Sequence, residues 1–363
     1  MLLMGNKITI RDSIVPTATC VAIPLITTNT SAYFGNISFN HNQEYLAGAL
    51  ELAKTRVEYQ TYVDKQLTID PRFNDYRSNG VTLAWKHEQF DLQMGGNGSR
   101  EYTLEQRAEL LERGKIRGID GHHINSVGEH RSMQANPDNI VFVTKEEHFE
   151  AHGGNWQNQT TGDTIDRAKM NRITNMCRVV KNEIRGLGIS TAIGFGVGVT
   201  ISAIIELSRT GLQNVDISLL LKRSLISGIE TAGISSITYV VGRGTSYALE
   251  RVFSLNPLAV TNILSVGAIS ASIAVVYQVA KMKIIGMSQD EIYDIAGKQA
   301  TISMLSVALT SLATGLYGGV GGIVASIGFT VIYLGYNIGS NIHNRALNDK
   351  LRAYTVEQYR PVV

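Results

Sequence analysis

The most informative stretch of this sequence, residues 121–155, reads GHHINSVGEHRSMQANPDNIVFVTKEEHFEAHGGN and holds five of the chain's eight histidines. Residues 119–124 and the β-branched run 140–143 are typical of strands, whereas the polar segment between them, with Pro137, is typical of a loop. Thr144 and Glu147 have the spacing of a capping box, and Gly153-Gly154 is a helix stop. We therefore expect strand, loop, strand and short helix.

The flanking sequence on the N-terminal side adds further helices. Apolar spacing predicts helices over residues 42–67 and 80–94. A third is expected over residues 103–113, since Thr103 and Gln106 form a second capping box and Gly114 follows. Residues 8–40 mix Ile, Val and Thr with two prolines, which favours short strands and turns.

The C-terminal half has a different composition, rich in Gly, Ala, Ser, Ile and Val. It contains uncharged runs over residues 186–205, 252–280 and 299–344, each long enough to cross a bilayer as a helix. The last run is interrupted by glycines at 318–322, which predicts a two-helix hairpin. Residues 224–242 are a weaker candidate because they include Glu230. A Gly/Ala-rich soluble bundle is the alternative for this half.

Bulk properties exclude several classes of protein. With 33 basic and 31 acidic residues the chain has no global field that would attract nucleic acid. Two cysteines exclude a disulfide framework and a cysteine zinc ribbon. The N-terminus lacks the basic and apolar regions of a secretory signal, so export by that route is not expected.

The histidine spacing indicates a site for one divalent cation. His148 and His152 lie one helical turn apart and therefore share a face. Neighbouring strand residues point to opposite sides, so one of His122 and His123 is expected to join them while the other acts as a base. Asn139 is expected to fix the loop or the base through its amide. A structural zinc site completed by His130 is the competing interpretation.

This stretch resembles the ββα-metal motif of HNH endonucleases, specifically the Gly-His-His and colicin-type nucleases found among bacterial polymorphic toxins. The similarity extends over roughly residues 75–165, from Thr103-x-x-Gln106-Arg107 through Pro137-Asp138-Asn139-Ile140 to Asn155-Trp156. It implies that His122, His148 and His152 bind a divalent ion (Mg, Mn, Ni or Zn). It also implies that His123 is the general base, that Asn139 is the central asparagine, and that the substrate is DNA, taken here as double-stranded.

The charge around the motif does not provide a strong phosphate-binding surface. Between Arg100 and Glu150 there are seven basic and ten acidic residues, a net charge of −3. Arg113, Lys115, Arg117 and Arg131 flank the motif and are the expected phosphate contacts. The six basic residues of 167–185 are expected to add to them or to face anionic lipid.

The sequence thus predicts an α+β nuclease module followed by an all-α hydrophobic, transmembrane domain. The expected divisions are an N-terminal α/β region of unknown role (1–74), the nuclease (75–165), a basic linker (166–185), the hydrophobic helices (186–344) and a polar tail (345–363). Expected partners are DNA, membrane lipid and further copies of the chain.

The predicted function is a DNA endonuclease of low sequence specificity, tethered to a bacterial inner membrane with its nuclease domain in the cytosol and acting in antagonism or in defence against foreign DNA. A soluble cytoplasmic protein is the second choice of location. The alternative function is a pore-forming or membrane-perturbing effector in which the histidines hold a structural metal.

Overall fold

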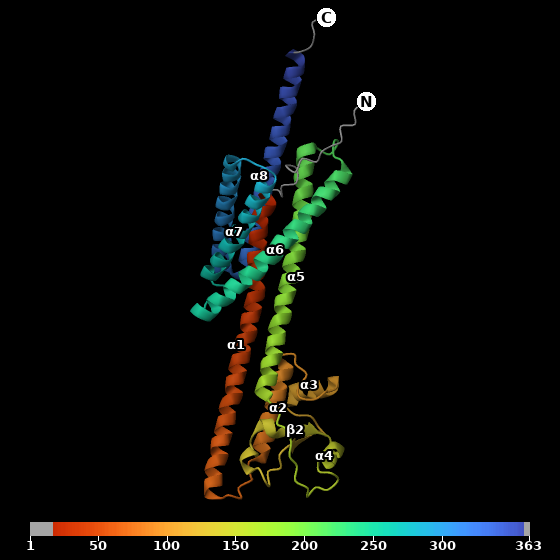
Figure 1. The fold of residues 1–363 in the computed structure, drawn as a ribbon, viewed down its shortest axis with the longest axis vertical. Coiled ribbons are helices and arrows are strands. Elements are labelled where there is room, and N and C mark those ends of the chain that lie inside the picture. Colours follow the sequence, from red (N-terminus) through yellow and green to blue (C-terminus); the bar gives the residue numbers. More distant parts are fainter. Residues whose placement is uncertain (1–16, 359–363) are drawn as a thin grey trace. The chain divides into compact units, whose positions relative to one another are not determined.

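A computed structural model describes residues 17–358 of the chain (Figure 1). They divide into two compact units: residues 40–181, called here the nuclease unit after the sequence prediction, and residues 17–39 with 182–358, called the helical unit. Two long helices, α1 (Thr17–Ile69) and α5 (Arg167–Thr210), contribute residues to both. We describe each unit separately.

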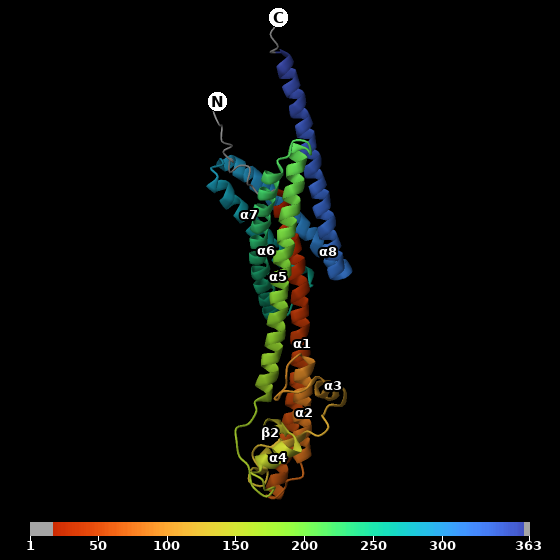
Figure 2. The same cartoon turned by 90° about the vertical axis from the view of Figure 1, so that its right-hand side faces the viewer.

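The nuclease unit has a two-stranded sheet against short helices. β1 (Asp120–His123) and β2 (Ile140–Val143) pair antiparallel, with His122 opposite Val141. Around them are α2 (Arg77–Gln93), α3 (Leu104–Arg113) and α4 (Lys145–Ala151), with 3₁₀ turns η2 (Arg131–Met133) and η3 (Pro137–Asn139) between the strands. Figures 1 and 2 show α2, α3, α4 and β2 gathered together. The predicted strand, loop, strand and helix order is confirmed.

The core of this unit is formed by side chains from α2, from α3 and the residues on either side of it, and from β2. The indole of Trp85 stacks on Phe142, with ring centroids 3.6 Å apart. Leu110 and Ile140 are fully buried in the same cluster. The core therefore anchors β2 against α2, and β2 in turn fixes where α4 begins.

Local sequence signals set the helix ends as expected. Thr103 caps α3 and Thr144 caps α4, each through a complete capping box with Gln106 or Glu147. After α3 the chain turns at Gly114, whose φ of 72° favours glycine. The turn after α4 uses Gly153 and Gly154 in the same way.

The first helix departs from expectation. The sequence predicts strands and turns over residues 8–40, but α1 is helical from Thr17 onward. The prediction of an α/β N-terminal region is therefore wrong for the described residues. Residues 8–16 lie outside the described part. The hydroxyl of Thr27 donates to the Ile23 carbonyl (2.9 Å) and that of Thr30 to the Ile26 carbonyl (2.8 Å). Each of these hydroxyls therefore has a partner one turn back in the same helix, so Thr can lie in the helix interior without leaving a polar group unsatisfied.

The helical unit contains α6 (Ile217–Phe253), α7 (Val260–Ile284) and α8 (Gln289–Gln358) besides parts of α1 and α5. α7 packs against both α6 and α8. Four helices among the described residues, α5 to α8, are long and apolar enough to cross a membrane. An all-α hydrophobic region is confirmed.

The predicted hairpin is present within α8. Gly318 has φ 71° and ψ −171°, which breaks the helix into two arms. The hydroxyls of Thr310 and Ser326 lie 3.4 Å apart, whereas sixteen residues of straight helix would span about 24 Å. The two arms therefore fold back on each other.

The segment expected to be a basic linker, 166–185, is helical from Arg167 because α5 begins there. Its first residue is fully buried and pairs with Glu88, which is also fully buried. The guanidinium also donates to the carbonyls of Pro137 (2.9 Å) and Ile140 (2.8 Å). Arg167 is consequently a core residue of the nuclease unit and not a contact for phosphate or lipid.

Candidate metal centre

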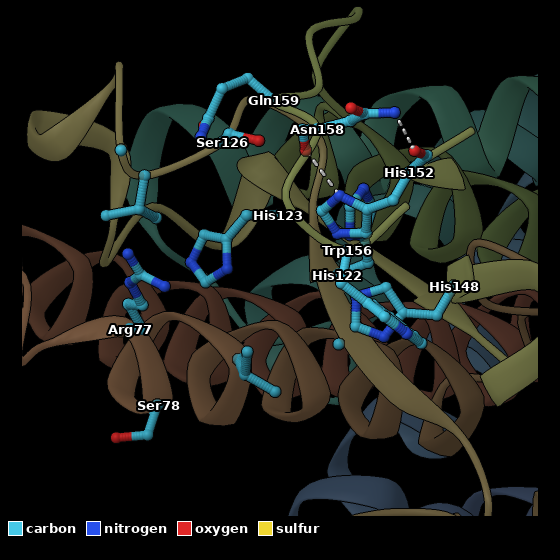
Figure 3. A pocket seen from close by; sticks show the side chains of 14 residues that line it. Arg77, Ser78, His122, His123, Ser126, His148, His152, Trp156, Asn158 and Gln159 are labelled. Atoms are coloured by element: carbon cyan, nitrogen blue, oxygen red, sulfur yellow. Dashed lines mark hydrogen bonds between the residues drawn. The ribbon is translucent and has the colours of Figure 1, made fainter. Parts of the chain in front are cut away.

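Three histidines from β1 and α4 converge on one point. The described chain contains one group of at least three potential metal ligands, His122, His148 and His152, whose nearest ligand atoms all lie within 4.8 Å of one another. β1 supplies the first, while the second lies on α4 and the third directly caps its C-terminal end. Figure 3 shows the three rings lying close together. His130, the possible fourth ligand of a structural zinc site, is not in this group.

Hydrogen bonds orient the exposed edge of the triad. Nδ1 of His152 lies 2.8 Å from the Asn158 carbonyl oxygen. A carbonyl only accepts, so Nδ1 must carry the proton and Nε2 keeps its lone pair. The Asn158 amide donates back to the His152 carbonyl at 2.7 Å, which closes the turn after α4 (Figure 3). Such outer contacts fix the tautomer that a metal ligand needs.

Two imidazoles of the triad are held in the neutral form that a metal binds. Burial, reinforced by the three neighbouring imidazoles, lowers the pKa of His122 to about 4. Burial and the His152 ring lower the pKa of His148, against the opposing effect of Asp120. Because a cation binds the neutral imidazole, His122 and His148 can accept a divalent metal without a proton having to leave.

His123 lies on the same cleft but outside the triad. Its Nε2 is 3.0 Å from the Gln134 carbonyl oxygen, which makes Nε2 the donor and leaves the Nδ1 lone pair free to accept a proton. Burial and the positive charge of Arg77 lower its pKa. The cleft has a volume of about 410 Å³ and is lined by His123 together with all three members of the triad.

Asn139 is completely buried and supports the site from behind. Its Oδ1 accepts from the Asn125 backbone amide (2.8 Å) and side-chain amide (3.0 Å), and its own amide donates to the Asn125 carbonyl (3.0 Å). Asn125 in turn binds Thr161 and Gly162. The structure therefore places Asn139 as a residue that fixes the loop after β1, one of the two roles expected for it.

Two long helices hold the segment between the strands. Arg56 of α1 pairs with Asp138 (2.8 Å) and donates to the Asn136 side chain (3.1 Å). Arg167 of α5 also binds this segment, through the Pro137 and Ile140 carbonyls. The segment supplies the Gln134 carbonyl that orients His123 and the Asn139 side chain that holds Asn125, so α1 and α5 position both groups.

The expected phosphate contacts lie away from the cleft. Arg113 and Arg117 sit near Glu109, at 3.5 and 3.7 Å, and Lys115 is exposed between α3 and β1. Arg131, in η2, is partly buried. Among the described side chains that line the cleft, none of these four occurs. Their role in binding nucleic acid stays a prediction.

Other residues line the cleft instead, and the sequence assigned them no role. They include Arg77 at the start of α2, and Trp156, Asn158 and Gln159 after α4. Trp156 was quoted only as the end of the Gly-His-His resemblance, and the other three belong to no recognisable spacing. The Gly153-Gly154 turn that brings the chain back toward the metal ligands was the only signal available for Asn158 and Gln159.

The geometry is that of a ββα motif whose three histidines could hold a metal ion, and comparison with known proteins agrees. Residues 72–144 match the family described as GHH signature containing HNH/Endo VII superfamily nuclease toxin, and this segment is a domain of that kind. His148 and His152 lie beyond the matched residues, so the triad is completed by structure outside them.

Curated relatives share the same segment. Over 71 residues the chain is 34% identical to Teneurin-1 of Mus musculus and of Homo sapiens, and 31% identical to Teneurin-3 of Mus musculus. The alignments cover 20% of this chain and 3% of each relative. The chain thus spans only a small fraction of the relatives' length. No solved structure matches it.

Proposed function

We propose that the chain is a divalent-metal-dependent endonuclease that hydrolyses phosphodiester bonds of DNA. The observation that carries this proposal is the joint occurrence, in one cleft, of three converging imidazoles and a fourth histidine whose Nδ1 is available as a proton acceptor. Membership of residues 72–144 in a nuclease toxin family supports phosphodiester hydrolysis.

Each residue then has a distinct part in the reaction. His122, His148 and His152 would hold the cation, which would stabilise the negative charge that develops on the phosphate. Nδ1 of His123 accepts the proton of the attacking water, while the Gln134 carbonyl keeps the ring in the productive tautomer. Asn139 holds the loop that carries this geometry.

Nicking of supercoiled plasmid by the full-length chain, with and without divalent cation, tests the proposal. We expect cleavage that EDTA abolishes and that His123→Ala reduces about 10²- to 10⁴-fold. His343→Ala is the matched control, since His343 is exposed in α8 of the helical unit. Metal-loaded protein that leaves plasmid, linear DNA and RNA intact would refute the assignment.

The arrangement of polarity in the helical unit supports membrane insertion, the second part of the proposal. Its interior contains small polar side chains, among them Thr231, Ser270 and Ser303, each fully buried. Its exterior presents large apolar ones: Leu316 is 74% exposed and Ile332 is 75% exposed. Water-soluble proteins bury such side chains, whereas lipid leaves small residues to mediate contact between helices.

Several charges within these helices form ion pairs, which lowers the cost of insertion. Glu230, which weakened the sequence argument, binds Lys281 of α7 at 2.7 Å, and Glu206 binds Arg223 at 2.6 Å. Basic residues next to a membrane span favour the cytosolic side. Four exposed ones precede the apolar part of α5: Lys169, Arg172, Lys181 and Arg185. They favour a cytosolic location for the nuclease unit, with the chain in a bacterial inner membrane.

Cell fractionation tests this part. The chain should pellet with membranes and resist extraction at alkaline pH, and the pellet should nick DNA when metal is added. Recovery as a monodisperse particle in detergent-free buffer would favour the soluble bundle instead.

A membrane-perturbing effector is the second candidate. It is favoured by buried hydroxyls of the helical unit that lack a hydrogen-bond partner, such as those of Ser227, Ser235 and Ser303. It predicts leakage from liposomes that His123→Ala leaves unchanged. Intact liposomes in the presence of nuclease-active protein would eliminate it.

A further inference from the structure

The side chain of Trp156 is exposed to solvent beside the histidine triad. The Trp156 indole is 55% exposed and lies with its ring centroid 5.1 Å from that of His148 and 5.7 Å from that of His152. Phe149, 40% exposed, packs beside it at 5.3 Å. An indole normally buries most of its surface, so an exposed one on the rim of a polar cleft needs a reason (Figure 3).

The same cleft has little positive charge to offer. Arg77 is the one Lys or Arg side chain among the described residues that line it. The surrounding sequence is acidic, with a net charge of −3 between Arg100 and Glu150. Non-specific binding to duplex DNA depends on neutralising several phosphates. A cleft with one cation needs another source of affinity.

We propose that this cleft takes an unpaired nucleotide, whose base stacks on Trp156 while its phosphate lies between Arg77 and the histidine triad. Bases stack on exposed aromatic side chains with affinity that depends little on sequence and that adds to the affinity from phosphate contacts. A base within a duplex has its faces covered by its neighbours and does not reach such a ring. A volume of about 410 Å³ suits a small ligand. The inference rests on the proposed nuclease function and specifies its substrate.

Binding is measured first, in a chain that does not cleave. The sequence has two tryptophans, and Trp85 is buried on Phe142, so quenching by a base reports on Trp156. We expect single-stranded oligo(dT) to quench the emission of His123→Ala protein, and blunt duplex of equal length to have little effect. With one phosphate contact, log Kd should rise with log salt with a slope near +0.7, about 0.7 per contact. Oligo(rU) in parallel distinguishes DNA from RNA.

Cleavage is measured second. Hairpin DNA should be cut in its loop with kcat/KM at least about tenfold above that of a paired duplex. Trp156→Leu should raise KM for the loop about 5- to 150-fold, whereas Trp156→Phe should retain most of the affinity. Tyr293→Leu is the matched control, since Tyr293 is an exposed aromatic of the helical unit.

Three outcomes overturn the inference while leaving the nuclease intact. The first is equal cleavage of loop and duplex, and the second is activity of Trp156→Leu equal to that of wild type. The third is loss of metal affinity in Trp156→Leu, because the indole would then support only the metal ligands. Unchanged fluorescence with oligonucleotide would also refute it. Absence of all cleavage despite stacking would instead contradict the proposed function.

Discussion

Replacing Arg167 with methionine should destabilise the nuclease unit by about 3 kcal/mol. The guanidinium is fully buried, pairs with Glu88 and donates to the Pro137 and Ile140 carbonyls. Removing one partner of a buried pair costs about 3–5 kcal/mol, because the other charge stays buried without compensation. We expect the lower end of this range for two reasons. The Glu88 carboxylate still accepts a hydrogen bond from the Ser99 backbone amide (2.7 Å), and methionine fills most of the volume that the arginine side chain leaves.

The measurement is urea unfolding of the full-length chain in detergent micelles, followed by tryptophan fluorescence. A Trp156→Phe background leaves Trp85, stacked on Phe142 in the core of the nuclease unit, as the reporter for that unit. Using one local reporter matters because a chain of two units need not unfold in a single transition. Arg172→Met, exposed on the same helix, is the control and should change stability by less than about 0.5 kcal/mol.

A second substitution separates charge from packing. Glu88→Gln added to Arg167→Met removes the stranded carboxylate and should recover part of the loss. If Arg167→Met lowers the free energy of unfolding by less than about 1 kcal/mol, the pair does not hold α5 to the nuclease unit.

Three further predictions concern the metal centre. Asn158→Ala removes the side-chain amide that donates to the His152 carbonyl and should weaken metal binding, measured by calorimetry, about 10-fold. Unchanged affinity would show that the Asn158 backbone carbonyl orients His152 without help from this amide. Thr144→Ala removes the cap of α4 and should cost about 1 kcal/mol of unfolding free energy in urea; an unchanged midpoint would show that packing alone holds α4. In the metal-free protein, the pKa of His122 is near 4 in the folded state and near 6.5 when unfolded, so the unfolded chain binds the proton first. Stability should therefore be fully present above pH 6.5 and fall between about pH 6.5 and 4, and His122→Asn should flatten that part of the profile.

The sequence alone determined the local course of the chain around the site. Thr144 and Glu147 define the start of α4, and the α8 hairpin turns at Gly318, inside the glycine run that predicted it. These features depend on backbone conformation and on contacts between near neighbours, which a linear pattern records. His122, His148 and His152 were found for the same reason, since a strand and one helical turn fix their spacing.

Tertiary structure alone decided what depends on distant partners. The Gln134 carbonyl selects the tautomer of His123, and burial of Arg167 turns a presumed surface cation into a core residue. The placement of Trp156 and Arg77 on one cleft also joins segments far apart in the chain. Burial and hydrogen-bond direction are properties of the folded surroundings, so residue type and spacing do not fix them.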